Sequence, residues 1–386
     1  MAHTTLLAII YLAFISLGLP DSVLGVAWPA MRLSLGQPLA AAGLVTLIIT
    51  ACSALSSLAS AAVLERLGTG PVVLVSGLLT GLGLLGFAFA PSMAWVLLSA
   101  VPLGLGAGSV DAGLNHFVAD HYSSRHMNWL HGCWGVGATI GPVLMGSALL
   151  GASGWQSGYR TIATIQLALA LVFLLSLRLW RQEHATPPPQ ATSGDGMAPR
   201  RVVPVWAAWL APALYLAYAT IEVGTGLWTA SILVDDRGLD APTAGLWVSC
   251  FFGSIMAGRF AVGLVAARLG NRRLVRLGLL LAIAGALIFS IKGLPAPLSL
   301  AGLVLLGLGC APVYPSLMHE TTRRFNAATA RRVVGRQVAF AYIGGALGPA
   351  ALGLLGAQWG LSFVMPVVVL ALLLLLLLSW QLDRVT

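Results

Sequence analysis

Long apolar segments, each interrupted by only a few polar residues, recur along almost the whole chain. A helix needs about 20 residues to cross the hydrocarbon core of a bilayer. The pattern predicts an all-α membrane protein with twelve membrane-spanning helices, at residues 6–30, 40–64, 71–91, 93–118, 127–151, 157–180, 203–233, 241–267, 273–291, 297–319, 331–356 and 362–380.

A polar stretch at residues 181–202 separates the first six segments from the last six. It contains three consecutive prolines and a Ser-Gly-Asp-Gly run, so it cannot span a membrane and is predicted to be a flexible cytoplasmic linker. The chain therefore divides into an N-terminal six-helix bundle, residues 1–180, and a C-terminal six-helix bundle, residues 203–386.

Short motifs of the first half return in the second half at a nearly constant offset. Leu-Gly-Leu-Gly at 103–106 recurs at 306–309, and Asp21, with a glycine four residues later, matches Glu222 in the same setting. Such an internal repeat predicts two pseudo-twofold-related bundles with a substrate site between them, near the middle of the membrane.

The composition and the charge distribution agree with this topology. Only 9% of the residues are charged, compared with about 25% in soluble domains. Sixteen of the 21 Lys and Arg residues fall on the side of both termini, four fall on the other side, and Arg259 falls within a span. Because positive residues stay in the cytoplasm, we expect a multi-pass protein of the bacterial inner (plasma) membrane with both termini cytoplasmic. The net charge of +9 then reflects orientation and does not indicate nucleic-acid binding.

Two neighbouring spans carry polar groups that lipid tolerates poorly. Asp111 and Asn115 are four residues apart and share one helix face, and the next span presents His131 and Trp134. An ionised Asp at the bilayer centre costs about 2.5–3.5 kcal/mol on insertion scales. These groups are predicted to line an aqueous cavity, with Asp111 as the proton carrier or else as a structural carboxyl. Asn115, His131 and Trp134 would bind a polar solute; interhelical hydrogen bonding for His131 and core packing for Trp134 are the alternatives.

Further ionisable groups lie inside other spans. Pro20 and Gly25 flank Asp21, so its helix is expected to be kinked. Asp21 then serves as an acceptor for substrate hydroxyls, coupled to Asp111, or caps the helix break. Glu222 is its counterpart, for substrate binding, proton coupling or gating. For Arg259, snorkelling to the cytoplasmic edge or pairing with a loop acid is favoured over clamping an anionic substrate.

Aromatic and amide side chains complete the candidate set. Tyr314 occupies the repeat position that matches the span-four acid and is expected to face it across the cavity. Gln337 and Tyr342 are further candidates for substrate binding. Trp28 and Trp228 lie near the outer ends of their spans and are predicted to be membrane-interface anchors.

The loop after the eighth span carries a family resemblance. Its sequence, Gly263-x-x-x-Ala267-Arg268-x-Gly270-Asn271-Arg272-Arg273, resembles the cytoplasmic loop signature of the major facilitator superfamily, and a weaker copy includes Glu65 and Arg66. The resemblance implies the twelve-helix major facilitator fold. It also implies a cytoplasmic latch formed by Glu65, Arg66, Gly263, Arg268 and Arg272; charges that only set the topology are the alternative.

A narrower resemblance is to the fucose–galactose–proton symporter family. It rests on Gly18-Leu-Pro-Asp21-Ser-x-x-Gly25-x-x-Trp28-Pro29, on Asp111-Ala-Gly-Leu-Asn115 and on Asn128-Trp-Leu-His131. The resemblance implies that Asp21 interacts with the sugar and that Asp111 carries the proton.

Motifs for other kinds of chemistry do not occur in the sequence. There is no Gly-Lys-[Ser/Thr] loop and no Ser/His/Asp nucleophile arrangement, so we expect neither ATP-driven transport nor an enzyme. The expected function is proton symport of a small polar solute, a sugar or sugar-like compound, and the alternative is proton-antiport efflux of drugs or metabolites. We expect no metal and no cofactor other than the proton gradient. The expected partners are the solute, protons and the lipid bilayer, with no nucleic acid, and the chain is expected to be a monomer.

Overall fold

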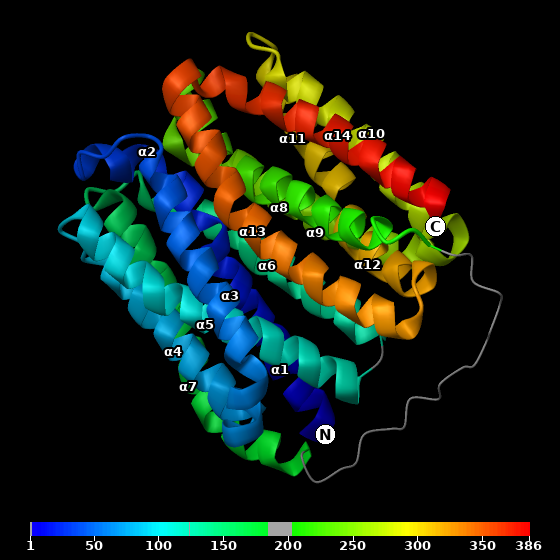
Figure 1. Cartoon of the computed structure of the whole chain (residues 1–386). Coiled ribbons are helices and arrows are strands. Elements are labelled where there is room, and N and C mark those ends of the chain that lie inside the picture. Colours follow the sequence, from blue (N-terminus) through cyan, green and yellow to red (C-terminus); the bar gives the residue numbers. More distant parts are fainter. Residues whose placement is uncertain (1, 123, 184–202) are drawn as a thin grey trace.

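The computed structural model describes residues 2–122, 124–183 and 203–386, and these form helices joined by short turns. The predicted linker at 181–202 lies outside the described residues, apart from the last turn of a helix that ends at Glu183. The N-terminal half (blue to green in Figure 1) contains α1 (Ala2–Asp21), α2 (Val23–Ser34), α3 (Ala41–Leu67), α4 (Thr69–Ala88), α5 (Met93–His121), α6 (Ser124–Ala148) and α7 (Gly154–Glu183).

The C-terminal half (green to red in Figure 1) repeats this arrangement of long helices. A π-helical turn at Ile232–Asp236 and a 3₁₀ turn at Leu361–Phe363 extend two of its spans. Its helices are α8 (Ala207–Ser231), α9 (Ala241–Leu269), α10 (Asn271–Ser290), α11 (Ala296–Cys310), α12 (Val313–Arg324), α13 (Ala327–Trp359) and α14 (Val364–Val385).

The helices of the described residues make twelve passes, because α1 with α2 and α11 with α12 each form one interrupted pass. This confirms the predicted twelve-helix fold. Ten of these passes, within the part of the chain that the structure describes, are long and apolar enough to be candidate membrane spans by themselves. The other two are α6 and α8, which carry the polar residues Trp134 and Glu222.

Both interrupted passes break at prolines. The first pass bends at Ser22, directly after Pro20 and Asp21, as expected from the sequence. The other bends at Ala311 and Pro312. Proline lacks the N–H that would bond to the preceding turn, so its helix kinks or ends there. At the first break the Ser22 hydroxyl donates a 2.8 Å hydrogen bond to the Ala138 carbonyl of α6, which fixes α1 against α6.

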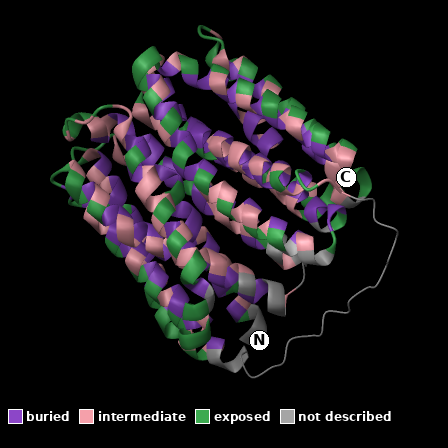
Figure 2. Cartoon of the chain, viewed as in Figure 1, coloured by how far each residue is buried: buried purple, intermediate pink, exposed green. Residues whose placement is uncertain are grey.

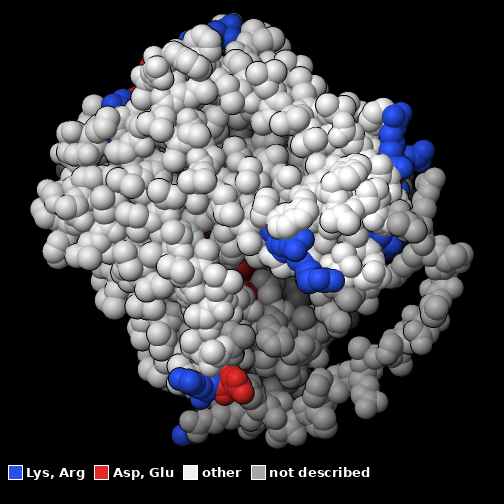
Figure 3. Space-filling model, viewed as in Figure 1, with Lys and Arg blue, Asp and Glu red and all other residues white. Residues whose placement is uncertain are grey.

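The outer surface of the bundle is apolar. Leucines such as Leu58 and Leu264 are 81% and 83% exposed, and Figure 2 shows exposed positions on the outward faces of the helices. In Figure 3 most of the surface in view is white, and the Lys and Arg residues form only a few separate groups on it. This surface suits contact with lipid tails.

Trp28 and Trp228, predicted to be interface anchors, are instead fully buried. The indole N–H of Trp28 donates a 2.9 Å hydrogen bond to the Leu39 carbonyl, and that of Trp228 donates a 2.8 Å bond to the Pro349 carbonyl. Each ring packs inside the protein because its polar atom finds a backbone acceptor there. The anchor prediction was wrong for both residues.

The two halves meet along α6 with α9 and along α3 with α13. Figure 1 places both chain termini at one end of the bundle, here named the terminal end; the opposite end is the far end. Near the far end a Cβ on Gly25 would lie 2.6 Å from the Leu227 carbonyl oxygen, so only glycine allows this approach of the halves. Arg32 and Asp235 add a 2.9 Å ion pair across the same interface.

Candidate functional site

Asp21 lies in the interior where the first pass is interrupted. Its side chain is exposed, although Leu19 and Ser22 on either side are buried among helices. The indole Nε1 of Trp134, on α6, donates a 2.8 Å hydrogen bond to the Asp21 carboxylate. An exposed carboxylate between two packed helices indicates a space that water can enter.

Trp134 connects this acid to the other half of the molecule. The guanidinium carbon of Arg259 on α9 lies 5.3 Å from the centre of the Trp134 ring, a cation–π distance. Arg259 in turn forms a 3.0 Å ion pair with Glu222 on α8, and the two side chains are only 15% and 12% exposed. Asp21, Trp134, Arg259 and Glu222 therefore form one contact path, here named the central relay.

Asp111 and Asn115 form a second polar group, on α5. The amide Nδ2 of Asn115 donates 2.9 Å to the Asp111 carboxylate, as expected for residues four apart on a helix. From the C-terminal half, Tyr342 and Tyr314 lie close enough to interact with the same carboxyl. Asp111 thus lies toward the other half of the protein and not toward the lipid. The Tyr314 ring packs against Tyr215 at 4.8 Å, and its position opposite Asp111 across the cavity stays a prediction.

The remaining predicted residues divide into two sets. His131 on α6 packs edge-on against Phe14 at 5.7 Å and lies near Arg259, beside the central relay. Gln337 is fully buried and exchanges hydrogen bonds with the Thr321 hydroxyl, at 2.9 Å and 3.2 Å, away from the relay. The structure therefore gives Gln337 a partner on α12 and does not bring it together with the other candidates. The side chain of Asn128 lies outside the described residues.

A recess between the halves is visible from one side of the molecule. Figure 3 shows Asp or Glu atoms lying deep below the white surface near the middle of the view. The acids of the site are partly accessible to solvent, and so are Asn115, Trp134 and Arg259. A polar interior with access to water between two bundles can bind a hydrophilic solute and exchange protons.

Two residues of the site were not selected from the sequence. Arg259 was expected at the cytoplasmic edge or near a loop acid; that expectation was wrong, because its partner is Glu222 of the neighbouring helix. Tyr218 lies one helical turn before Glu222 and is close to both Glu222 and Arg259, and its hydroxyl donates to the Cys310 carbonyl at 3.1 Å. The spacing of Tyr218 and Glu222 was the one signal that could have revealed this residue.

Arg272 of the predicted latch belongs to an ionic network at the terminal end. Its Nε lies 3.0 Å from Glu320 on α12, and its NH1 donates 3.2 Å to the Asp383 carbonyl on α14. Arg276 and Arg324 also pair with the Asp383 carboxylate. All five residues belong to the C-terminal half, so this network fastens α10, α12 and α14 to one another.

The other predicted latch residues lie apart from that network. Glu65, Arg66, Gly263 and Arg268 are exposed, and no ion pair joins them to another residue in the described part of the chain. Gly263 faces open space, so its small size is not needed for packing here. In this conformation these residues do not join the two halves.

The sequence of this chain is similar to those of known proteins. The chain matches the family described as Major Facilitator Superfamily over residues 10–231 and 215–386. "Uncharacterized transporter y4wD" of Sinorhizobium fredii is 26% identical over 274 residues, which cover 69% of this chain and 68% of that protein. The methyl viologen resistance protein SmvA of Salmonella typhimurium is 29% identical over 184 residues, 46% of this chain and 36% of SmvA.

Solved structures share the fold at low sequence identity. A bacterial homologue of the human lysosomal transporter Spinster, in an inward-facing and occupied conformation, has a TM-score of 0.80 at 16% identity, covering 100% of this chain and 97% of that chain. A variant of the nucleoside transporter NupG has a TM-score of 0.74 at 13% identity, covering 97% and 98%. At such identities the likeness establishes the fold and leaves the solute open.

Proposed function

This chain belongs to the Major Facilitator Superfamily, and from that premise we propose that it is a secondary transporter that moves a small polar solute, a sugar or sugar-like compound, by proton symport. The observation that carries the proposal is the central relay, in which Trp134 of one half contacts Arg259 of the other. Alternating access requires the halves to rock about a site between them. A contact path across that site changes as they rock, so solute binding can be linked to the conformational change.

Proton coupling is assigned to Asp111 and Asp21. Within the described residues no Arg or Lys pairs with either carboxyl, whereas Glu222 is neutralised by Arg259. An acid that reaches water and has no cationic partner can gain and lose a proton as its surroundings change. We therefore propose that Glu222 takes part in the contact between the halves and that the two aspartates bind and release the proton.

A neutral, hydroxyl-rich solute suits the groups around the relay. Asn115 offers an amide, Tyr314 and Tyr342 offer hydroxyls, His131 offers an imidazole, and Trp134 offers an aromatic face. Arg259 is already paired with a carboxylate, so an anionic solute would have to displace Glu222. This favours polyols and sugars over carboxylate or phosphate compounds.

The proposed orientation places the terminal end in the cytoplasm of a bacterium, with the protein in the inner membrane. Sixteen of the 21 basic residues lie on that side of the spans. The close approach at Gly25 and the Arg32–Asp235 pair support a conformation that is closed at the far end, toward the outside.

Proton-driven efflux of an organic cation is a second candidate function. The observation behind it is the similarity to SmvA, a methyl viologen resistance protein, over 46% of this chain. Two carboxyls without basic partners among the described residues, Asp21 and Asp111, would attract a cation. In this reading the cation and the proton would compete for the same acids.

Transport by the purified protein in liposomes tests both candidates. With an imposed proton gradient, symport predicts accumulation of a labelled sugar from a panel, driven in the same direction as the protons. Antiport predicts movement of labelled methyl viologen against the protons. Asp111→Asn should abolish accumulation but retain solute exchange, whereas Asp240→Asn, an exposed far-end cap that Asn can replace, should leave accumulation unchanged. Undiminished accumulation by Asp111→Asn would refute its role as proton carrier.

A further inference from the structure

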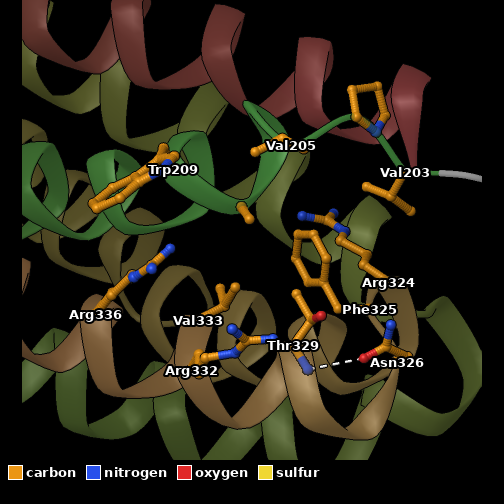
Figure 4. Close-up of a pocket in the computed structure, with 12 residues that line it drawn as sticks. Val203, Val205, Trp209, Arg324, Phe325, Asn326, Thr329, Arg332, Val333 and Arg336 are labelled. Carbon is orange, nitrogen blue, oxygen red and sulfur yellow. Dashed lines mark hydrogen bonds between the residues drawn. The ribbon is translucent and has the colours of Figure 1, made fainter.

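A cavity of about 550 Å³ lies at the terminal end of the C-terminal half, apart from the residues of the central relay. It is formed where the start of α8, the end of α12 and the start of α13 meet (Figure 4). Its size falls within the range of about 300–1,000 Å³ that is usual for small-ligand pockets. We name it the basic pocket.

Three arginines give the basic pocket a strongly positive lining. Arg324 comes from α12, and Arg332 and Arg336 come from α13; no Asp or Glu is among the residues that line it in the described part of the chain. Figure 4 shows the three guanidinium groups around the cavity. The N-terminus of α13 also borders it, where the Thr329 N–H donates 2.8 Å to the Asn326 side chain. Positive side chains and a helix N-terminus both favour an anion.

Arg324 provides an independent indication that the pocket is a ligand site. Its side chain is only 5% exposed, and although its NH2 group pairs with Asp383, its buried Nε–H has no acceptor. A buried N–H without an acceptor is unfavourable, and such groups usually meet a ligand or water. Arg332 is exposed and forms no ion pair with another described residue. The Nε–H of Arg324 and the guanidinium of Arg332 are thus available to phosphate oxygens, and Arg332 can bind them with paired N–H groups.

The mouth of the pocket is apolar and faces the surface expected to meet lipid. Trp209 is 51% exposed and Val205 is 81% exposed. The guanidinium of Arg336 lies 4.0 Å from the centre of the Trp209 ring, which joins the charged and apolar parts of the lining. Tryptophan is enriched where the hydrocarbon core meets the head groups, and basic pockets between helices on the cytoplasmic side bind anionic lipid head groups.

We propose that the basic pocket binds the phosphate group of an anionic phospholipid. Arg324, Arg332 and Arg336 hold the phosphate, and the acyl part lies along Trp209 and Val205. A bound lipid would join the terminal ends of α8 and α13. The first of these helices carries Glu222 of the central relay, and the second carries Tyr342, which lies near Asp111. Soluble inorganic phosphate carries the same charged oxygens, so lipid and inorganic phosphate are titrated separately.

Native mass spectrometry of the full-length protein, titrated with phosphatidylglycerol, phosphatidylcholine or inorganic phosphate, tests this proposal. Phosphatidylglycerol should bind at least tenfold more tightly than phosphatidylcholine. The double variant Arg332→Gln/Arg336→Gln should weaken phosphatidylglycerol binding at least tenfold. Arg384→Gln is the matched control, because Arg384 also stacks on a tryptophan, Trp380, at 3.4 Å but does not line the pocket. The affinity of this variant for phosphatidylglycerol should stay within twofold of that of the unmodified protein.

Equal binding of the two lipids, or an unchanged affinity of the double variant, would overturn the proposal. Binding of inorganic phosphate that the double variant loses, without preference for phosphatidylglycerol, would overturn the lipid as the ligand and assign a soluble phosphate compound. If the double variant does not fold, as judged by its melting temperature without lipid, the exposed single variant Arg332→Gln takes its place, with at least a threefold loss of affinity expected.

Discussion

The indole nitrogen of Trp134 lies 2.8 Å from the carboxylate of Asp21, so that α6 and α1 meet at a hydrogen bond in the interior of the protein. The same ring lies 5.3 Å from the guanidinium carbon of Arg259, which belongs to the other half. Trp134 thus contacts an acid of its own half and a base of the opposite half.

Trp134→Phe keeps an aromatic ring but removes the N–H that binds Asp21. Hydrogen bonds to charged groups contribute about 1.5–3 kcal/mol, so the initial rate of proton-driven uptake should fall by about 10- to 150-fold. Trp95→Phe is the matched control, because Trp95 donates a 3.0 Å hydrogen bond to the Gly86 carbonyl outside the site. Equal rates for Trp134→Phe and the unmodified protein would contradict a functional role for this bond.

Removal of one partner from the Arg259–Glu222 pair leaves a poorly solvated charge. Glu222→Gln should lower the free energy of unfolding by about 3 kcal/mol, at the lower end of the range for breaking a buried pair. Glu222→Gln combined with Arg259→Gln should be more stable than either single variant, as measured by thermal melting. If the effects of the two substitutions simply add, the pair does not contribute a coupling energy.

The ion pair between Arg32 and Asp235 should hold the far end closed. Arg32→Asp places two acids together there and is expected to open that end. A membrane-impermeant maleimide added on the far side should then label the cysteine of an Asp21→Cys variant several-fold faster. This measurement uses a background in which the four native cysteines are replaced. The exchanged pair, Arg32→Asp with Asp235→Arg, should restore slow labelling. Fast labelling in the exchanged variant would show that the ion pair does not control closure.

Gly18 allows α1 to pack directly on α6. A Cβ at this position would overlap the backbone carbonyl of Trp134, so Gly18→Ala should push the helices apart. We expect a loss of several degrees in melting temperature and weaker transport, because the contact between Asp21 and Trp134 depends on this packing. Gly335→Ala, at an exposed helical position that faces open space, should not lower the melting temperature.

The spans, the two-bundle repeat and the break near Asp21 could be predicted from the sequence because each depends on local properties. A segment enters a bilayer according to its own length and apolarity. Pro20 interrupts its helix whatever that helix packs against. Asp111 and Asn115 meet because they are four residues apart on one helix. The prediction that these groups face inward rested on the high cost of a charge in lipid.

Tertiary structure alone decided which distant groups meet. Arg259 pairs with Glu222, Gln337 is buried against Thr321, and Trp28 lies in the core and not at the interface. These outcomes depend on how each helix is rotated and on which backbone carbonyl comes within reach of a side chain. Apolar composition puts a helix in the membrane but does not set its rotation, which is determined by packing between residues far apart in the chain.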